Sequence, residues 1–120
     1  MPMNHALELK VLPVPGRADS RIIKLSGEFD ASAVERALEE VTSLLDTGVK
    51  HLVADCEDLR YVNSTGLGVI LHFSRVARER GGSFLLCKVS EPVYEIIEII
   101  GATALLELHE SVEAAIGSLP

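Results

Sequence analysis

His51-Leu52-Val53-Ala54-Asp55-Cys56 is nearly continuously apolar over the length of one β-strand. Such a run is typical of a central strand that is covered on both faces. Ser83-Phe84-Leu85-Leu86-Cys87-Lys88 has the same character. Between the two lies an apolar-rich segment, 67–80, which predicts a helix that ends at Gly81-Gly82. A strand, a helix and a strand in this order predict two parallel strands joined by a right-handed crossover.

Upstream of this unit, the sequence predicts a hairpin. The segments 7–11 and 21–26 alternate apolar and polar residues, as half-buried strands do. The short connection between them favours antiparallel pairing. Pro13-Val14-Pro15-Gly16 is expected to interrupt the ladder and to open a polar turn that runs through Asp19-Ser20.

Helices and short strands are expected in the rest of the chain. A helix that ends at Gly48 begins either with the capping box Ser32-Ala33-Val34-Glu35 or with Asp30 as its N-cap. The remaining segments predict a connecting loop, a helix with Pro92 in its first turn, a short strand and a terminal helix, at 57–62, 90–101, 103–108 and 111–116.

The expected order of elements is β-β-α-β-α-β-α-β-α. After the hairpin, strands and helices alternate, which predicts an α/β fold with a mixed, mostly parallel β-sheet, an N-terminal β-hairpin and about four helices packed on it. We expect residues 1–120 to form a single domain, with the hairpin toward one side of the sheet.

Composition limits the function classes. The 120 residues are 48% apolar and 24% charged, which is typical of a globular domain. A net charge of −7 and only 4% aromatic residues disfavour nucleic-acid binding and attachment to a lipid surface. Cys56 and Cys87 lie inside apolar runs and are expected to be buried free thiols. The chain begins without a basic or apolar leader, so we expect a cytoplasmic protein.

Three segments are expected to meet at one edge of the sheet. The carboxyl ends of parallel strands share an edge, and ligand sites in open α/β sheets lie there. The three segments are 27–30, 58–66 and Val89-Ser90. From the residues alone, Asn63 or Ser64 is a plain helix N-cap. No cofactor or metal motif is evident, because the glycines around Leu67 lack the Lys-Ser/Thr ending of a P-loop and no residues have metal-ligand spacing.

Asp58-Leu59-Arg60-Tyr61-Val62-Asn63-Ser64-Thr65-Gly66-Leu67-Gly68-Val69-Ile70-Leu71 resembles the signature of STAS domains. The resemblance is closer still to the bacterial anti-sigma factor antagonists and covers nearly the whole chain. Leu25-Ser26-Gly27-Glu28-Phe29-Asp30 and Gly81-Gly82 also match the family pattern. One departure is Asn63, which stands where the family usually has an acid.

The resemblance implies a regulatory binding protein rather than an enzyme. In the family, the serine at the position of Ser64 is phosphorylated by an anti-sigma factor that is a serine kinase. The unphosphorylated form binds the anti-sigma factor and releases a sigma factor. A phosphatase is a further expected partner, Thr65 is a second hydroxyl open to modification, and the chain is expected to be a monomer or a weak homodimer. The expected partner-binding residues are Glu28, Asp30, Asp58, Asn63, Ser64, Thr65, Gly66, Leu67 and Ser90.

The sequence leaves two other functions to consider, a serine hydrolase and a STAS module of a different complex. A serine hydrolase is disfavoured because Val62 occupies a position where the nucleophile elbow needs Gly. No histidine lies in the loops at the predicted edge; the four are His5, His51, His72 and His109. The stronger alternative is a STAS interaction module of another signalling or lipid-transport complex that works without phosphorylation.

Overall fold

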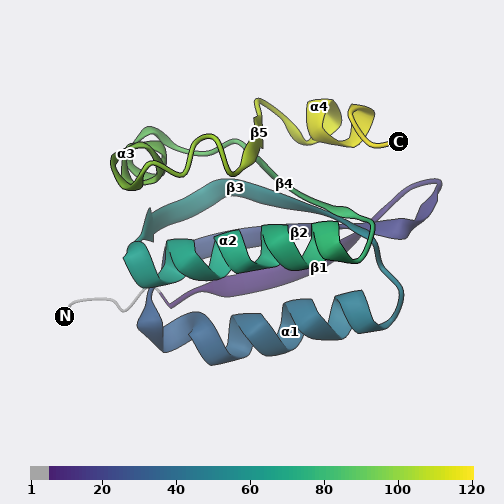
Figure 1. Cartoon of the computed structure of the whole chain (residues 1–120), viewed down its shortest axis with the longest axis horizontal. Helices are drawn as coiled ribbons and strands as arrows, with labels where there is room; N and C mark the ends of the chain where they lie inside the picture. The colour runs from purple at the N-terminus through teal and green to yellow at the C-terminus, as the bar shows by residue number, and fades with distance from the viewer. Residues whose placement is uncertain (1–5) are drawn as a thin grey trace.

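Within residues 6–120, which the structure describes, five strands form one sheet whose order in space is their order in the chain (Figure 1). The structure is a computed structural model. The first two strands pair antiparallel, and all later neighbours pair parallel. The predicted mixed, mostly parallel sheet with an N-terminal hairpin is therefore confirmed. The strands are β1 (Glu8–Val14), β2 (Arg17–Phe29), β3 (His51–Val62), β4 (Ser83–Cys87) and β5 (Glu107–His109).

Helices cover both faces of this sheet. A larger apolar core contains side chains of α1, α2 and α3, whereas a smaller one contains side chains of α4. In Figure 1, α1 and α2 run side by side in front of the sheet. The helices are a short 3-10 helix (Ala31–Ala33), α1 (Val34–Asp46), α2 (Ser64–Glu79), α3 (Glu91–Ile100) and α4 (Val112–Gly117).

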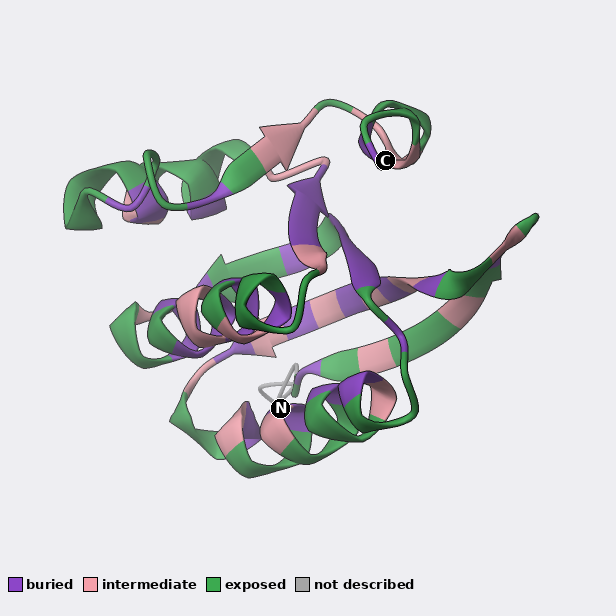
Figure 2. Ribbon diagram, turned by 45° about the vertical axis from the view of Figure 1, so that its right-hand side comes forward, coloured by how far each residue is buried: buried purple, intermediate pink, exposed green. Residues whose placement is uncertain are grey.

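The central strands are buried on both faces, as their continuous apolar runs predict. In β3, Leu52 and Ala54 belong to the larger core, and Val53 between them belongs to the smaller one. In β4, Leu86 and Cys87 divide in the same way. Figure 2 shows these strands as buried ribbon between the helices. The alternation follows from the two-residue period of a strand.

The predicted loop at 57–62 is wrong, because this segment is the second half of β3. It pairs with β2 up to Phe29 opposite Val62, and two register shifts interrupt the ladder. Leu59 and Val62 are buried, while Glu57, Asp58, Arg60 and Tyr61 are exposed. Bulges of this kind add a residue to one strand and break the period of two, which is why the segment does not look like a strand in the sequence.

Two further boundaries differ from prediction. Strand β1 includes Pro13, because β1 is an edge strand where a missing N–H is tolerated, and the turn is only Pro15-Gly16. The strand expected at 103–108 is shorter and starts at Glu107. The preceding residues form turns, in one of which the Leu105 N–H donates to the Ala102 carbonyl.

Both cysteines are free and buried, as expected. Cys56 packs in the larger core and Cys87 in the smaller one, so their thiols lie on opposite faces of the sheet. Burial raises the pKa of Cys56 well above its usual value and that of Cys87 to about 11. Both thiols are therefore protonated at neutral pH and poor nucleophiles. In the part of the chain that the structure describes, every helix is too short or too polar to cross a membrane.

Candidate functional site

Strands β2 and β3 extend beyond the rest of the sheet and end side by side. Phe29 and Val62 are their last paired residues. Directly after them, the Asn63 N–H donates to the Phe29 carbonyl at 3.2 Å. This hydrogen bond ties the segment 27–30 to the start of α2, so two of the three segments predicted to converge do so.

Asn63 is the N-cap of α2. Its backbone is extended, and its side-chain Oδ1 accepts a hydrogen bond from the Gly66 N–H at 2.8 Å. The helix thus begins at Ser64, three residues earlier than predicted. Of the two residues predicted as possible caps, Asn63 and Ser64, the cap is Asn63. An N-cap satisfies a backbone donor that the helix itself leaves unpaired.

The hydroxyls of Ser64 and Thr65 stand in the first turn of α2, and both residues are exposed. Because the Asn63 side chain takes the capping role, neither hydroxyl is needed to hold the helix. The free N–H groups of this turn and the helix dipole give it a partial positive charge that favours anions. Ser64 is therefore both accessible and placed where an added phosphate is tolerated.

Gly66 and Leu67 hold this turn against the sheet. A Cβ on Gly66 would overlap the carbonyl oxygen of Phe29. Leu67 is 1% exposed and belongs to the larger core. Although both were expected to contact a partner, their contacts in the structure are with the sheet, and the exposed surface of the turn comes from Ser64 and Thr65.

Acidic side chains lie on the two strands that lead to the turn, or directly after them. Glu28 and Asp30 are half-buried, and Asp58 is exposed with Lys24 as its ion-pair partner at 3.9 Å. Asp30 caps the 3-10 helix before α1, so the predicted capping box at 32–35 is not the start signal. Hydrogen bonds from the Ser32 hydroxyl and backbone N–H lower the pKa of Asp30, which keeps this carboxylate ionised at neutral pH.

Ser90, the third predicted member of this edge, lies elsewhere. Strand β4 ends at Cys87 opposite Asp55, whereas β3 continues to Val62. Two bulges shorten this stretch of β3: from Asp55 to Val62 it runs beside only five steps of β2, from Lys24 to Phe29, and so covers about 17 Å at about 3.3 Å per residue. From Cys87, the chain can reach at most about 11 Å by Ser90. The expected convergence is wrong because parallel neighbours of unequal length do not end at the same edge.

A histidine–serine pair does exist at the other end of the sheet. His51 Nδ1 and Ser83 Oγ lie 2.8 Å apart, as neighbours in the register of β3 and β4. The Asp19 carboxylate is 3.9 Å from His51 Nε2, which is too long for a hydrogen bond. The pair joins two strand starts and lacks the third member of a catalytic triad. His5 lies outside the described residues.

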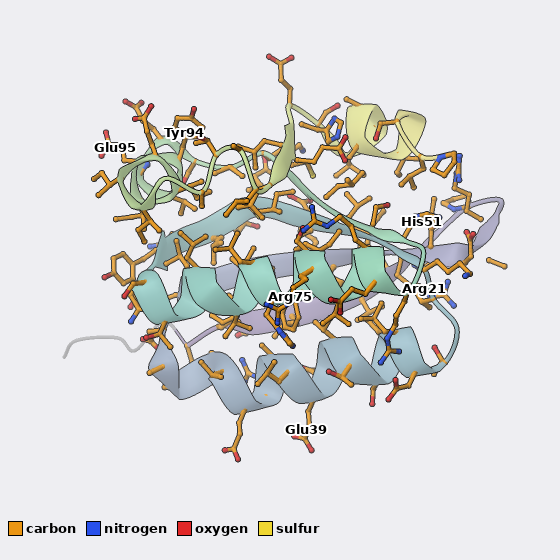
Figure 3. The ribbon with its side chains drawn as sticks, viewed as in Figure 1. Arg21, Glu39, His51, Arg75, Tyr94 and Glu95 are labelled. Atoms are coloured by element: carbon orange, nitrogen blue, oxygen red, sulfur yellow. The ribbon has the colours of Figure 1, made fainter. Side chains whose placement is uncertain are left out.

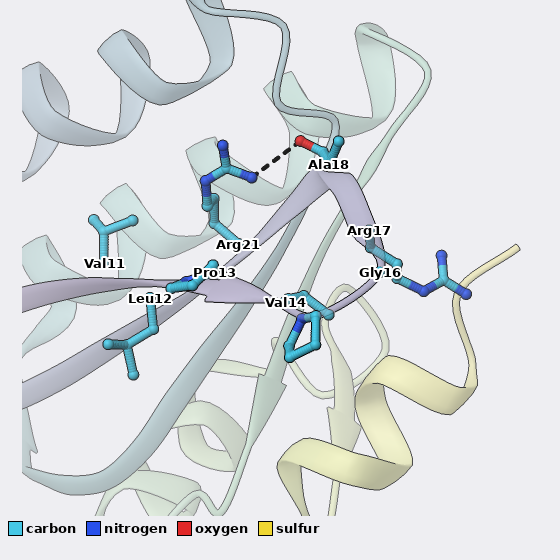
Figure 4. Close-up of a pocket in the computed structure, with 9 residues that line it drawn as sticks. Val11, Leu12, Pro13, Val14, Gly16, Arg17, Ala18 and Arg21 are labelled. Carbon is cyan, nitrogen blue, oxygen red and sulfur yellow. Dashed lines mark hydrogen bonds between the residues drawn. The ribbon is translucent and has the colours of Figure 1, made fainter.

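A hollow that is remote from Ser64 lies at the tip of the hairpin, between Val11 and Arg21, and has a volume of about 630 Å³ (Figure 4). The Arg21 guanidinium donates to the Ala18 carbonyl at 3.0 Å, and Arg17 donates to the carbonyls of Leu119 and Pro120. Both arginines are engaged with backbone, so this hollow shows no group aimed at a ligand.

The family model of the STAS domain matches residues 11–115. The chain belongs to the STAS domain family. Anti-sigma F factor antagonist of Paenibacillus polymyxa is 25% identical over 91 residues, which are 75% of this chain and 78% of the relative. The predicted family is therefore confirmed, and relatives with such names are regulatory binding proteins rather than enzymes.

Solved structures share the fold of this STAS domain. Unphosphorylated SpoIIAA, an anti-sigma factor antagonist, superposes with a TM-score of 0.73 at 23% identity and covers 92% of this chain and 93% of its own. Phosphorylated SpoIIAA, a Bacillus cell fate determinant, gives a TM-score of 0.67 at 22% identity over 93% and 97%. These likenesses confirm the α/β architecture with helices on the sheet.

The capping role of Asn63 leads to a prediction. Asn63→Ala removes the acceptor of the Gly66 N–H, and we expect it to lower the free energy of unfolding by about 1 kcal/mol. Ser90→Ala is the matched control, because Ser90 is the N-cap of α3 but makes no side-chain capping bond. That change should stay within about 0.5 kcal/mol. Urea unfolding measures both, and equal losses would contradict the assignment of Asn63 as the cap.

Proposed function

We propose that this STAS domain is an anti-sigma factor antagonist switched by phosphorylation of Ser64. The unphosphorylated form binds an anti-sigma factor that is a serine kinase and so releases a sigma factor. Transfer of the γ-phosphoryl group of ATP to Ser64 Oγ by that kinase ends the binding. Glu28, Asp30, Asp58 and Thr65 belong to the same docking surface.

The observation that carries the proposal is the exposed Ser64 as the first residue of α2, next to a capping Asn63. The hydroxyl can be modified without loss of the cap, and the helix N-terminus stabilises a phosphate. The names of the relatives and the existence of SpoIIAA structures in both states support the same role. Asn63 replaces the usual acid but supplies the capping oxygen that an acid would supply.

Phosphosite mapping tests this proposal. The protein is incubated with ATP and with each kinase-type anti-sigma factor encoded in the same genome, and the modified residue is identified by mass spectrometry. We expect one phosphate on Ser64, none on the Ser64→Ala variant, and unchanged incorporation in Thr65→Ala. Full incorporation in Ser64→Ala would refute Ser64 as the site, and no incorporation with any kinase would favour a STAS module without a phosphoswitch.

A further inference from the structure

The outward side of α2 carries a stripe that begins at Ser64. Residues at helical positions i, i+4, i+7, i+11 and i+14 lie along one side of a helix. In α2 these residues are Ser64, Gly68, Leu71, Arg75 and Arg78, and we call them the α2 stripe. Ser64, Gly68, Arg75 and Arg78 are exposed, and Leu71 is half-buried. Figure 3 shows Arg75 on the outer side of the helix.

A groove runs beside this stripe. It has a volume of about 320 Å³ and is lined by Gly68, Leu71, His72, Arg75, Arg78 and Leu105. Leu105 comes from the turn after α3 and is 54% exposed, so it forms an apolar wall across from α2. A second groove of about 300 Å³ shares Arg78 and Leu105 with the first. The two hollows therefore adjoin at the end of the groove where Arg78 and Leu105 lie.

The charge of this groove is opposite to that of the chain. The protein carries a net charge of −7, yet the first groove is lined by two arginines and no acid. Among residues 6–120, Arg75 and Arg78 have no carboxylate within ion-pair distance, whereas the neighbouring Arg80 pairs with Asp46 at 2.8 Å. Arg75 instead lies 3.1 Å from His72 Nδ1. Glu107 lines the second groove only.

We propose that this groove binds an acidic amphipathic helix of the protein partner that meets Ser64. The proposal rests on the proposed function and names the part of the partner that the α2 stripe contacts. Carboxylates three or four residues apart on the partner helix match Arg75 and Arg78, which are three apart on α2. Apolar side chains of the same helix pack on Leu71 and Leu105. At Gly68, where a Cβ would meet nothing within 4 Å, the partner backbone can come close.

The apolar wall favours a peptide over a phosphate compound. A phosphate site needs backbone N–H groups or a cluster of donors that converge on one point. Arg75 and Arg78 are instead spread along the helix, with Leu71 and Leu105 beside them. This mixture of cations and exposed apolar side chains is complementary to an acidic amphipathic helix.

The groove and Ser64 act separately on such a partner. Along α2, Arg75 is about 16 Å from Ser64, since a helix rises 1.5 Å per residue. This distance exceeds the Debye length of about 8 Å at physiological ionic strength. The arginines are therefore too far away to neutralise a phosphate on Ser64. Such a phosphate repels the end of the acidic partner helix that lies near Ser64, while the arginines attract its other end.

An NMR titration tests the groove directly. The probes are three 16-residue amphipathic helical peptides with identical apolar residues and with Glu, Gln or Lys on the polar face. Amide shifts of the ¹⁵N-labelled protein are recorded with each. We expect the Glu peptide to shift Gly68, Leu71, Arg75, Arg78 and Leu105, and the Lys peptide to leave them unmoved. Equal effects of the Glu and Lys peptides, shifts away from the groove, or no shifts would overturn the proposal.

Variants of the protein provide a second test of the groove. Arg75→Glu with Arg78→Glu should weaken binding of the Glu peptide by at least about tenfold, since like charges then face each other. Gly68→Leu should block the groove, whereas Gly117→Leu in α4, where a Cβ also meets nothing, is the control. Shifts with ATP or pyrophosphate but not with the Glu peptide would make the groove an anion site and overturn the proposal. Because the titration uses no kinase, failure of Ser64 phosphorylation and failure of the groove are distinguishable.

Discussion

Gly66→Ala is expected to lower the free energy of unfolding by about 2 to 3 kcal/mol, as over-packed core substitutions do. The new Cβ would overlap the Phe29 carbonyl oxygen, which is backbone and cannot rotate away. The overlap is removed only if α2 moves away from the end of β2, and that movement strains two hydrogen bonds. These join the Asn63 N–H to the Phe29 carbonyl and the Gly66 N–H to the Asn63 side chain. The loss is a large share of the 5 to about 15 kcal/mol that stabilise a typical domain.

Gly68→Ala is the matched control, because it makes the same change two residues along α2. There the added Cβ meets nothing within 4 Å. Alanine is the better helix former by up to about 1 kcal/mol, so this variant should be as stable as the parent or more stable. Urea unfolding of the two variants measures the difference. If Gly66→Ala were as stable as Gly68→Ala, the close approach of α2 to β2 would be wrong.

The sequence predicts the architecture well where local pattern and burial agree. The apolar runs 51–56 and 83–88 are central strands because both of their faces meet helices. The segment 57–62 is missed because its register shifts replace the alternation of a strand with buried residues three apart, Leu59 and Val62. Propensity and period carry no signal for a bulge, which depends on the partner strand.

Part of the candidate site could also be predicted from the sequence, because local pattern is enough where the residues are adjacent in the chain. Asn63, Ser64 and Gly66 are adjacent in the chain, so the turn that they form can be inferred from the residues alone. The proximity of Gly66 to Phe29 can also be inferred, because β2 and β3 are parallel neighbours that end side by side. The error at Ser90 arises from unequal strand lengths. The groove along α2 could not be inferred, because Leu105 reaches it from a turn that the sequence pattern assigns to a strand.

Phosphorylation of Ser64 is expected to lower the affinity for the anti-sigma factor by about 100-fold, or about 2.7 kcal/mol. The phosphate adds a charge of about −1.5 to −2 at neutral pH, and its bulk extends from an exposed first turn. The carboxylates of Glu28 and Asp30 flank Phe29, whose carbonyl is bonded to Asn63, and already add negative charge beside this turn. An acidic segment of the partner is then repelled, while the fold is kept because Asn63 still caps α2. Isothermal titration calorimetry of the two forms measures the change.

Two comparisons separate this repulsion from a loss of structure. Ser64→Glu should reproduce part of the effect, whereas Ser43→Glu adds the same charge to an exposed position near the end of α1 and should leave binding unchanged. The amide spectra of the phosphorylated and parent proteins should differ only around the first turn of α2 and the ends of β2 and β3. Equal affinities of the two forms would refute the switch. Shifts throughout α1 and α2 would instead mean that the phosphate acts by rearranging the domain, because repulsion at a preserved surface moves no distant amide.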